Sequence, residues 1–247
     1  EAHNNLGLVL KELGRLGEAE ASYRHAIALK PDYAEACSNL GNTLKELGRL
    51  DEAEANLKRA IALKPRYAEV IYNLSTVQSY MDNLEGEIVS LQAILQIDSH
   101  NYGLKAFVNL AICHFLNGNF ADSKKNLLAA KAIKGKSSLE FKNDKVYWRY
   151  LSSILNWHEE KYLDCCKPKT DKILHVIGES HSLGCHNLLV KSSGSDVLCK
   201  AKLIKGCKQW HLGNSTRNQY KNKFESAFYS IPKSSEVLLV IGEIDCR

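Results

Sequence analysis

The stretch that decides the fold is LKELGRLGEAEA at residues 10–21, because it returns almost unchanged as LKELGRLDEAEA at residues 44–55. Two further matches have the same offset of 34 residues: Asn5-Leu6-Gly7 with Asn39-Leu40-Gly41, and Ala28-Leu29-Lys30-Pro31 with Ala62-Leu63-Lys64-Pro65. A fixed period of this length indicates stacked copies of one structural unit. The sequence therefore predicts a solenoid in the N-terminal part of the chain.

Each unit carries the signals of two antiparallel helices joined by a short turn. Apolar residues recur at helical spacing, and small residues between them allow two helices to approach closely. Gly14 and Gly48 stand where the first helix of each unit should end, and Pro31 and Pro65 end the second helix. We therefore expect one helical hairpin per period.

This pattern resembles the tetratricopeptide repeat, in which small, large apolar, aromatic and proline residues have fixed places. The residues that fill these places are Gly7, Leu10, Ala19, Tyr23, Ala26 and Pro31, and then Gly41, Leu44, Ala53, Leu57, Ala60 and Pro65. Two weaker units begin near Ala68 and about 36 residues later, which extends the repeats over residues 1–133. The resemblance implies an α-solenoid that binds a protein or an extended peptide in its concave groove.

One asparagine occupies the same place in all four units, as Asn5, Asn39, Asn73 and Asn109. Stacked units would line these residues up along one edge, which we expect to be concave. A side-chain amide has both a donor and an acceptor, so a ladder of amides could hold a peptide backbone. The ladder is similar to that in the repeat domain of O-GlcNAc transferases. The alternative is that asparagine is simply tolerated on an exposed helical face.

The sequence changes character twice after the repeats. Residues 134–164 have apolar residues at broadly helical spacing, which predicts a closing helical segment over the last repeat. Residues 165–171 contain Pro168 and form a linker unsuited to a helix. We place a second domain at residues 172–247.

The second domain alternates strand and helix signals. Compact β-branched runs at Lys172–Ile177 and Glu236–Ile241 are typical of buried parallel strands, and Val197–Ile204 is a third candidate. Leu183–Val190 and Ser215–Ile231 have helical patterns. This order predicts an α/β fold, a partial doubly wound parallel sheet.

The two strongest strand candidates, the first and the last, both end in Gly-Glu, within Gly178-Glu179-Ser180-His181-Ser182 and Gly242-Glu243-Ile244-Asp245. Chemistry in open α/β sheets gathers at the carboxyl ends of strands, and a serine at a strand-to-helix turn suits a nucleophile. These residues resemble the blocks of the SGNH or GDSL hydrolases, which are flavodoxin-like esterases and acylhydrolases. The resemblance implies Ser180 as the nucleophile, Gly206 as an oxyanion donor with Gly213 as its reserve, and Gly242 and Asp245 in the third block.

Three departures from that family bear on activity. Glu179 replaces its Asp, and Ile244 replaces the Asn that donates to the oxyanion. The Asp-x-x-His base of the family would follow Arg247, so we expect these 247 residues to show little or no hydrolysis. His181 and His211 are the other histidines that could serve as the base.

Two alternatives of another class stay open. The first is an interaction scaffold with an inert α/β domain, which fits Ile244. The second is an adaptor similar to O-GlcNAc transferases, although the α/β part is too short for such a catalytic domain.

Composition sets the remaining limits. Hydrophobic residues make up 45% and charged residues 25%, which is typical of globular proteins. The net charge is +5, but the lysines are spread out and are not interleaved with aromatic residues, which argues against a nucleic-acid partner. No apolar stretch reaches the roughly 18 residues of a membrane helix, and the first ten residues do not form a secretory signal. We expect a cytoplasmic protein without a membrane partner.

Cofactor signals are also missing from the sequence. The eight cysteines are scattered and are best explained as reduced, buried thiols, including Cys37 and Cys113. No paired Cys-x-x-Cys, phosphate loop or dinucleotide motif occurs, so we expect no metal and no cofactor. The chain begins without Met and inside the periodic pattern, and we expect it to be part of a longer protein.

Overall fold

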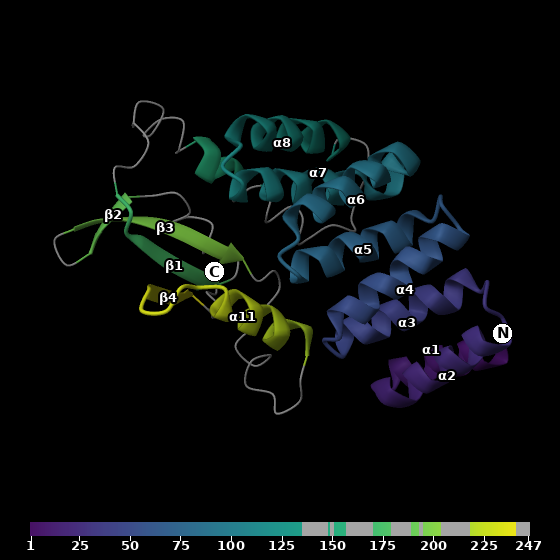
Figure 1. Cartoon of the computed structure of the whole chain (residues 1–247). Coiled ribbons are helices and arrows are strands. Elements are labelled where there is room, and N and C mark those ends of the chain that lie inside the picture. Colours follow the sequence, from purple (N-terminus) through teal and green to yellow (C-terminus); the bar gives the residue numbers. More distant parts are fainter. Residues whose placement is uncertain are drawn as a thin grey trace. The chain divides into compact units, whose positions relative to one another are not determined.

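The computed structural model describes residues 1–134, 148, 151–156, 170–178, 189–192, 195–203 and 218–240 (Figure 1). The chain divides into two compact units. The first consists of Glu1–Ser99 with Asn214–Lys223, and the second of His100–Gly213 with Phe224–Arg247.

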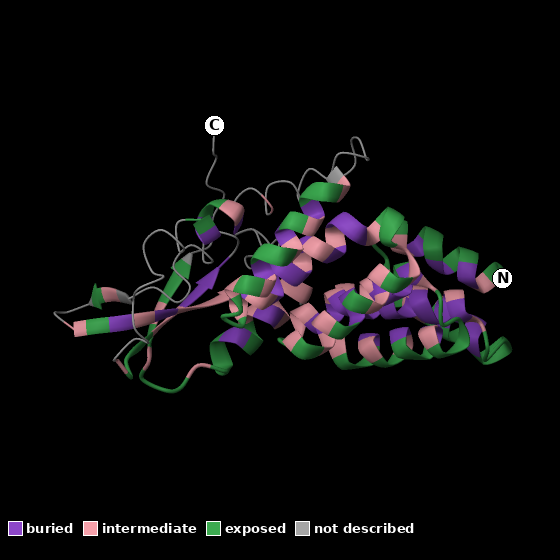
Figure 2. Cartoon of the chain, turned by 90° about the horizontal axis from the view of Figure 1, so that it is seen from above, coloured by how far each residue is buried: buried purple, intermediate pink, exposed green. Residues whose placement is uncertain are grey.

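Three helical hairpins make up most of the first unit. Their helices are α1 (Ala2–Glu12) with α2 (Leu16–Leu29), α3 (Ala34–Glu46) with α4 (Leu50–Leu63), and α5 (Ala68–Tyr80) with α6 (Leu84–Ile97). Each hairpin also packs on the next, because α2 contacts α3 and α4 contacts α5. Figure 2 shows buried residues along the sides of these helices that face one another. The prediction of one helical hairpin per period is confirmed.

Small residues set the distance between the two helices of a hairpin. A Cβ atom on Gly7 would lie 2.6 Å from Cε1 of Tyr23, and one on Gly41 would lie 2.8 Å from Cγ of Leu57. Real carbon atoms do not pack this closely, so a larger residue at either position would push the helices apart. Tyr23 and Leu57 are completely buried at these crossings.

Tyr23 fills the seam between α1 and α2. Its hydroxyl is buried and has no hydrogen-bond partner among the residues that the structure describes, an arrangement that costs about 1–3 kcal/mol. Burial, with smaller contributions from the carboxylates of Glu46 and Glu12, raises the pKa of Tyr23 to about 12. The packing of the ring therefore has to outweigh an unsatisfied polar group.

A fourth hairpin lies in the second unit and consists of α7 (Ser99–Leu116) and α8 (Phe120–Lys134). The hydroxyl of Ser123 in α8 donates to the carbonyl of Ala111 in α7 at 2.7 Å. Residues 151–156 are helical and share a buried cluster with this hairpin through Leu151, Ile154 and Leu155. The indole Nε1 of Trp148 donates to the carbonyl of Leu127 at 3.0 Å, so this aromatic residue has a packing role.

The turn inside each hairpin contains one residue with a positive φ. These residues are Gly14 (φ 74°), Gly48 (φ 77°), Asp82 (φ 58°) and Gly118 (φ 75°). The predicted helix ends at Gly14 and Gly48 are confirmed. Asp82 takes the same place in the third hairpin, because Asp and Asn tolerate the left-handed region better than other residues with a side chain.

The second unit also contains a four-stranded sheet with the order β2-β3-β1-β4. Its strands are β1 (Ile173–Gly178), β2 (Leu189–Ser192), β3 (Ser195–Leu203) and β4 (Glu236–Val240). β1 pairs in parallel with both β3 and β4, whereas β2 pairs antiparallel with β3. Helix α11 (Gln219–Tyr229) precedes β4 in the chain. The sheet is therefore mixed and mostly parallel.

The sheet corrects two predictions. A fully parallel sheet is wrong because β2 is antiparallel, and the helix predicted at Leu183–Val190 is wrong at its end, where Leu189 and Val190 belong to β2. The rest of that predicted helix lies outside the described residues. Ser192 pairs with Ser195, so two residues join the strands, and the intervening Ser-Gly favours a tight hairpin. So short a connection allows only antiparallel pairing.

The two cysteines singled out as buried thiols lie in the described residues. Cys37 and Cys113 are buried in α3 and α7, and burial raises the pKa of the Cys37 thiol. In the described ranges, no group of three or more His, Cys, Asp or Glu side chains could hold a metal ion. No helix in these ranges is long and apolar enough to cross a membrane.

The turn geometry gives a first prediction. Gly14→Ala should lower the free energy of unfolding by about 1 kcal/mol, because a side chain at positive φ strains the backbone. The cost is purely conformational, since nothing lies within 4 Å of the new Cβ atom. Gly17→Ala is the matched control. Gly17 is an exposed residue of α2, and a Cβ atom there would also have nothing within 4 Å, so this change should raise the free energy of unfolding by about 0.5–1 kcal/mol.

Urea denaturation of the parent and both variants measures these differences. If both alanines changed stability in the same direction and by the same amount, the turn would not need its left-handed residue.

Candidate functional site

The first helices of the hairpins in the first unit, α1, α3 and α5, lie next to one another. Neighbouring helices cover two sides of α3, with α2 on one side and α4 on the other. On α3 the third side carries Asn39, Asn42, Lys45 and Glu46, at helical spacing and half-buried. We call the corresponding polar side of α1, α3 and α5 the first-helix face. Its members, besides those on α3, are Asn5 and Lys11 on α1 and Asn73 and Thr76 on α5.

The structure places the predicted asparagines as follows. Asn5 is exposed on α1, and Asn39 and Asn73 are half-buried on α3 and α5. These three therefore lie on adjacent helices of one unit. Asn109 is in the second unit, on α7, where its Nδ2 donates to the carbonyl of Lys105 at 2.8 Å. The first unit thus brings three members of the predicted ladder together.

Asn4 was not singled out in the sequence, yet it contacts the ladder. The Nδ2 of Asn39 donates to the Oδ1 of Asn4 at 2.9 Å, which joins α3 to α1. Asn4 itself is buried, and its equivalent one period later, Ser38, is a buried polar residue too. A short polar residue that recurs directly before the ladder position is the signal that could have found it.

A cation and a carboxylate link the same two helices. The Nζ of Lys11 on α1 lies 3.0 Å from the Oε1 of Glu46 on α3. One period later, the same two places are held by Lys45 and Tyr80, and Tyr80 has no carboxylate. Lys45 makes no hydrogen bond or ion pair with the described residues of the chain. Comparison of equivalent positions in successive units would have revealed this difference from the sequence.

Burial lowers the pKa of Lys45, and the nearby Lys11 lowers it further, while Glu46 partly offsets both effects. Asn42 precedes Lys45 by almost one helical turn. Its Oδ1 is buried and has no hydrogen-bond partner among the described residues. Less than one turn of α3 therefore carries an ammonium donor and an amide acceptor that the described residues leave unsatisfied.

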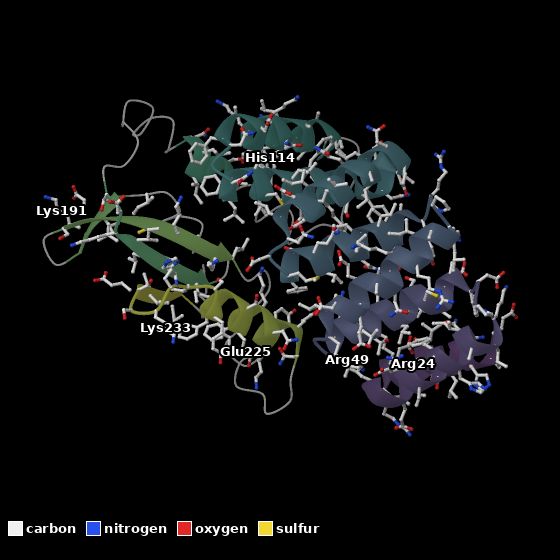
Figure 3. All side chains as sticks on the ribbon, viewed as in Figure 1. Arg24, Arg49, His114, Lys191, Glu225 and Lys233 are labelled. Carbon is white, nitrogen blue, oxygen red and sulfur yellow. The ribbon has the colours of Figure 1, made fainter. Side chains whose placement is uncertain are left out.

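Charged residues in and beside the second helices α2 and α4 form a network of ion pairs, which includes Arg24 and Arg49 (Figure 3). Arg49 lies 2.7 Å from Glu20 on α2 and 2.5 Å from Glu52 on α4, and Arg24 lies 2.9 Å from Glu20. Hydrogen bonds to Glu52 and Glu20 raise the pKa of Arg49, and the bond from Arg49 lowers that of Glu52. This network joins one hairpin to the next, which is a structural role.

In the α/β part, the predicted site residues Ser180, Gly206, Gly242 and Asp245 lie outside the described residues. The same holds for Glu179, His181, His211, Gly213 and Ile244. What the structure does describe is the strand end before Ser180. Gly178 pairs with Leu203 of β3 and with Val240 of β4, so the carboxyl ends of the three parallel strands meet at one edge of the sheet.

His175 is a further polar residue of the sheet. It lies on the central strand β1 opposite Lys200, and its Nδ1 is buried with no partner among the described residues. Burial, with a smaller contribution from Lys202, lowers the pKa of His175. A histidine held neutral inside a sheet fits packing, and we assign it no chemistry.

Comparison with known proteins agrees with the helical part. Residues 1–66 match the family model of the tetratricopeptide repeat. No curated protein matches the chain. Several solved structures are similar in fold.

YrrB is described as a TPR protein with an unusual peptide-binding site. It is 17% identical, with a TM-score of 0.54 over 65% of this chain and 78% of its own. PilF of Pseudomonas aeruginosa is 19% identical, with a TM-score of 0.54 over 66% and 69% of the two chains. MamA of Desulfovibrio magneticus RS-1 is 18% identical, with a TM-score of 0.51 over 55% and 76%. These likenesses show a shared fold, and within it residues 1–66 match the tetratricopeptide repeat.

Proposed function

We propose that the first-helix face binds an extended peptide, either alone or as a segment of a partner protein. The observation that carries this proposal is the pair on α3, where, among the residues that the structure describes, Lys45 lacks an acceptor and the Oδ1 of Asn42 lacks a donor. Buried polar groups without partners cost folding free energy. A ligand that supplies both partners would remove that cost.

The spacing of the ladder suits an extended chain. Packed helices lie about 8–10 Å apart, and an extended peptide advances roughly 3.3 Å per residue. Every third residue of such a peptide would therefore meet the next asparagine, from Asn5 to Asn39 to Asn73. Each amide can accept from a peptide N–H and donate to a peptide carbonyl, which favours backbone recognition without strong sequence preference.

Lys45 adds a preference for acidic peptides. A carboxylate within reach of its ammonium would replace the partner that Glu46 provides to Lys11. Hydrogen bonds between charged groups are stronger than neutral ones, so this contact would select Asp or Glu at one position of the peptide. YrrB, which shares the fold, is described as having an unusual peptide-binding site, and this supports peptide binding as the class of function.

We propose a second function for residues 172–247, which follow the repeats (1–133), the closing segment (134–164) and the linker (165–171). In this proposal they form a doubly wound, flavodoxin-like domain of the SGNH hydrolase type. Ser180 is its nucleophile, Gly206 an oxyanion donor, and Gly242 and Asp245 its third block.

One feature of the sheet supports this second proposal. β1 lies between two parallel neighbours that come later in the chain, the arrangement at which ligands bind in open α/β sheets. Ser180 follows β1 by two residues in the sequence, and Gly242 follows β4 by two residues. The two parallel strands end at the same edge of the sheet. The alternative is an interaction scaffold with an inert α/β part.

The ladder is tested by removing two of its amides. Peptides that bind the parent chain are first selected from random twelve-residue peptides displayed on phage. These peptides should bind the Asn39→Ala, Asn73→Ala double variant about 10- to 100-fold more weakly. The reason is that the variant lacks several hydrogen bonds to the peptide, of about 0.5–1.5 kcal/mol each. Asn56→Ala is the matched control, because Asn56 lies on the second helix α4 and bonds its own helix.

Fluorescence anisotropy with the selected peptides measures the affinities. Unchanged binding by the double variant, or equal losses in the double variant and the Asn56 control, would rule out the ladder.

Replacing Lys45 with an uncharged residue should stabilise the folded protein but weaken its binding of acidic peptides. Lys45→Met removes a half-buried cation that has no ion-pair partner in the described part of the chain, so it should raise the free energy of unfolding at pH 7 by about 0.5 kcal/mol. The lowered pKa of Lys45 means that the folded protein loses free energy by holding this side chain in its charged form. The advantage of the variant should therefore shrink as the pH rises toward the ordinary lysine value of about 10.4.

The same Lys45→Met variant should bind acidic peptides from the selection about tenfold more weakly and neutral ones unchanged. Lys11→Met is the matched control, since it removes a paired cation and should not stabilise the protein. Denaturation across this pH range and anisotropy give the two readouts. Equal binding of acidic peptides by parent and variant would contradict the assignment of Lys45.

The hydrolase proposal is tested with a fluorophosphonate probe and the full chain. Ser180 should become labelled slowly, because the chain contains no Asp-x-x-His base, and Ser180→Ala should abolish the label. Ser182→Ala is the control and should keep it. Mass spectrometry of the labelled peptide locates the adduct, and a chain that carries none at Ser180 would favour the scaffold.

A further inference from the structure

A short stretch from late in the sequence, residues 218–223, packs on the turns of the repeats. Residues 214–223 belong to the same compact unit as the first three hairpins. Asn218 caps the start of α11, because its Oδ1 accepts hydrogen bonds from the backbone N–H groups of Tyr220 and Lys221 at 3.0 Å. We call residues 218–223 the docked segment.

The docked segment contacts the turns of two successive hairpins. The Nδ2 of Asn222 donates to the carbonyl of Gly48, and the Nζ of Lys223 pairs with the carboxylate of Asp82. The same Nζ donates to the carbonyl of Ser79 at 2.6 Å. Lys223 is only 3% exposed, so these oxygens satisfy a charge that is almost fully buried. The contact therefore depends on the two turn residues with a positive φ and on what lies beside them.

The first hairpin shows the same turn without a docked segment. Gly14 holds the place of Gly48 one period earlier. It is exposed, and a Cβ atom built on it has nothing within 4 Å among the described residues. Gly48, in contrast, is buried directly against Asn222. The docked segment thus distinguishes the later turns from the first one.

The docked segment also reaches the end of the first-helix face. The ring of Tyr220 packs edge-to-face on that of Tyr80 in α5, with the ring centroids 6.0 Å apart. On the preceding pair of helices, Lys11 lies 3.0 Å from Glu46. Lys45 and Tyr80 hold the same two places one period later, which puts Tyr80 and its cover beside Lys45.

One atom makes the docking incomplete. The Oε1 of Gln219 is buried and has no hydrogen-bond partner among the described residues. A buried acceptor without a donor costs free energy, and a segment that leaves its place returns such an atom to water. The docked state is therefore one that a competing ligand can displace.

We propose that the docked segment is a lid on the Lys45 end of the first-helix face, which an acidic peptide has to displace in order to reach Lys45. The lid rests on the peptide binding proposed above and adds regulation to it. When the lid is closed, Tyr220 covers Tyr80, and the ion pair of Lys223 with Asp82 holds the segment in place. Loss of that pair releases the lid, because so deeply buried an ammonium needs its carboxylate.

Two substitutions open the lid from opposite sides. Lys223→Glu places a carboxylate against Asp82, and Asp82→Asn removes the charge while keeping a residue that tolerates a positive φ. Lys233→Glu is the matched control, because it makes the same change of charge at an exposed lysine. Hydroxyl-radical footprinting read by mass spectrometry should show Tyr80 oxidised about threefold faster in both open variants and unchanged in the control. Tyr33, at the opposite end of α3 from Lys45, is the internal reference.

Peptide binding measures what the lid does. Acidic peptides selected on the parent chain should bind both open variants about three- to tenfold more tightly, because the face no longer spends most of its time closed. The two substitutions change the net charge in opposite directions, so a gain common to both does not come from long-range attraction. Adding Lys45→Met to either open variant should cancel the gain.

The footprint needs no peptide, so the lid and the proposed peptide binding fail separately. An unchanged Tyr80 footprint in both variants overturns the lid. Faster oxidation of Tyr80 without a gain in peptide affinity overturns it too, since the segment would then be a structural clamp. A selection that yields no peptide on the parent or on the open variants overturns the proposed peptide binding, and the lid with it, whatever the footprint shows.

Discussion

The contact between Gly7 and the ring of Tyr23, repeated between Gly41 and Leu57, fixes how closely the two helices of a hairpin approach. The rest of the first unit depends on this distance. If either glycine carried a side chain, the second helix would have to move outward, and this would change the distance between Glu20 on α2 and Arg49 at the start of α4. A missing side chain therefore governs contacts within a hairpin and between hairpins.

The same close packing divides each first helix into sides with different tasks. On α3, Gly41 and Leu44 face α4, and Leu40 and Thr43 belong to the buried side toward α2. The remaining side is polar and half-buried, and it carries Asn39 with its neighbours. Two sides are thus committed to the fold, and the third can vary without loss of packing. Lys45 and Tyr80, in the places of Lys11 and Glu46, are an example of such variation.

The repeats could be predicted from sequence because each hairpin is specified by local signals that occur twice. The turn at Asp82 was harder to predict, because a residue with a positive φ is usually a glycine. The sheet was predicted only in part, because β2 is short and its pairing with β3 depends on a two-residue connection. The unsatisfied Lys45 could not be seen in one unit at all. It emerges only when Glu46 is compared with Tyr80 one period later, and the structure then shows that Glu46 pairs with Lys11 of the preceding first helix.

Tyr23 connects the packing of the first hairpin to alkaline pH. The unfolded chain ionises a tyrosine near pH 10, whereas the folded chain keeps this phenol neutral up to about 12. Between these values the unfolded state gains free energy from ionisation that the folded state does not, so the stability of the repeats declines as hydroxide concentration rises. The ring that closes the seam between α1 and α2 thereby makes this hairpin sensitive to strong base.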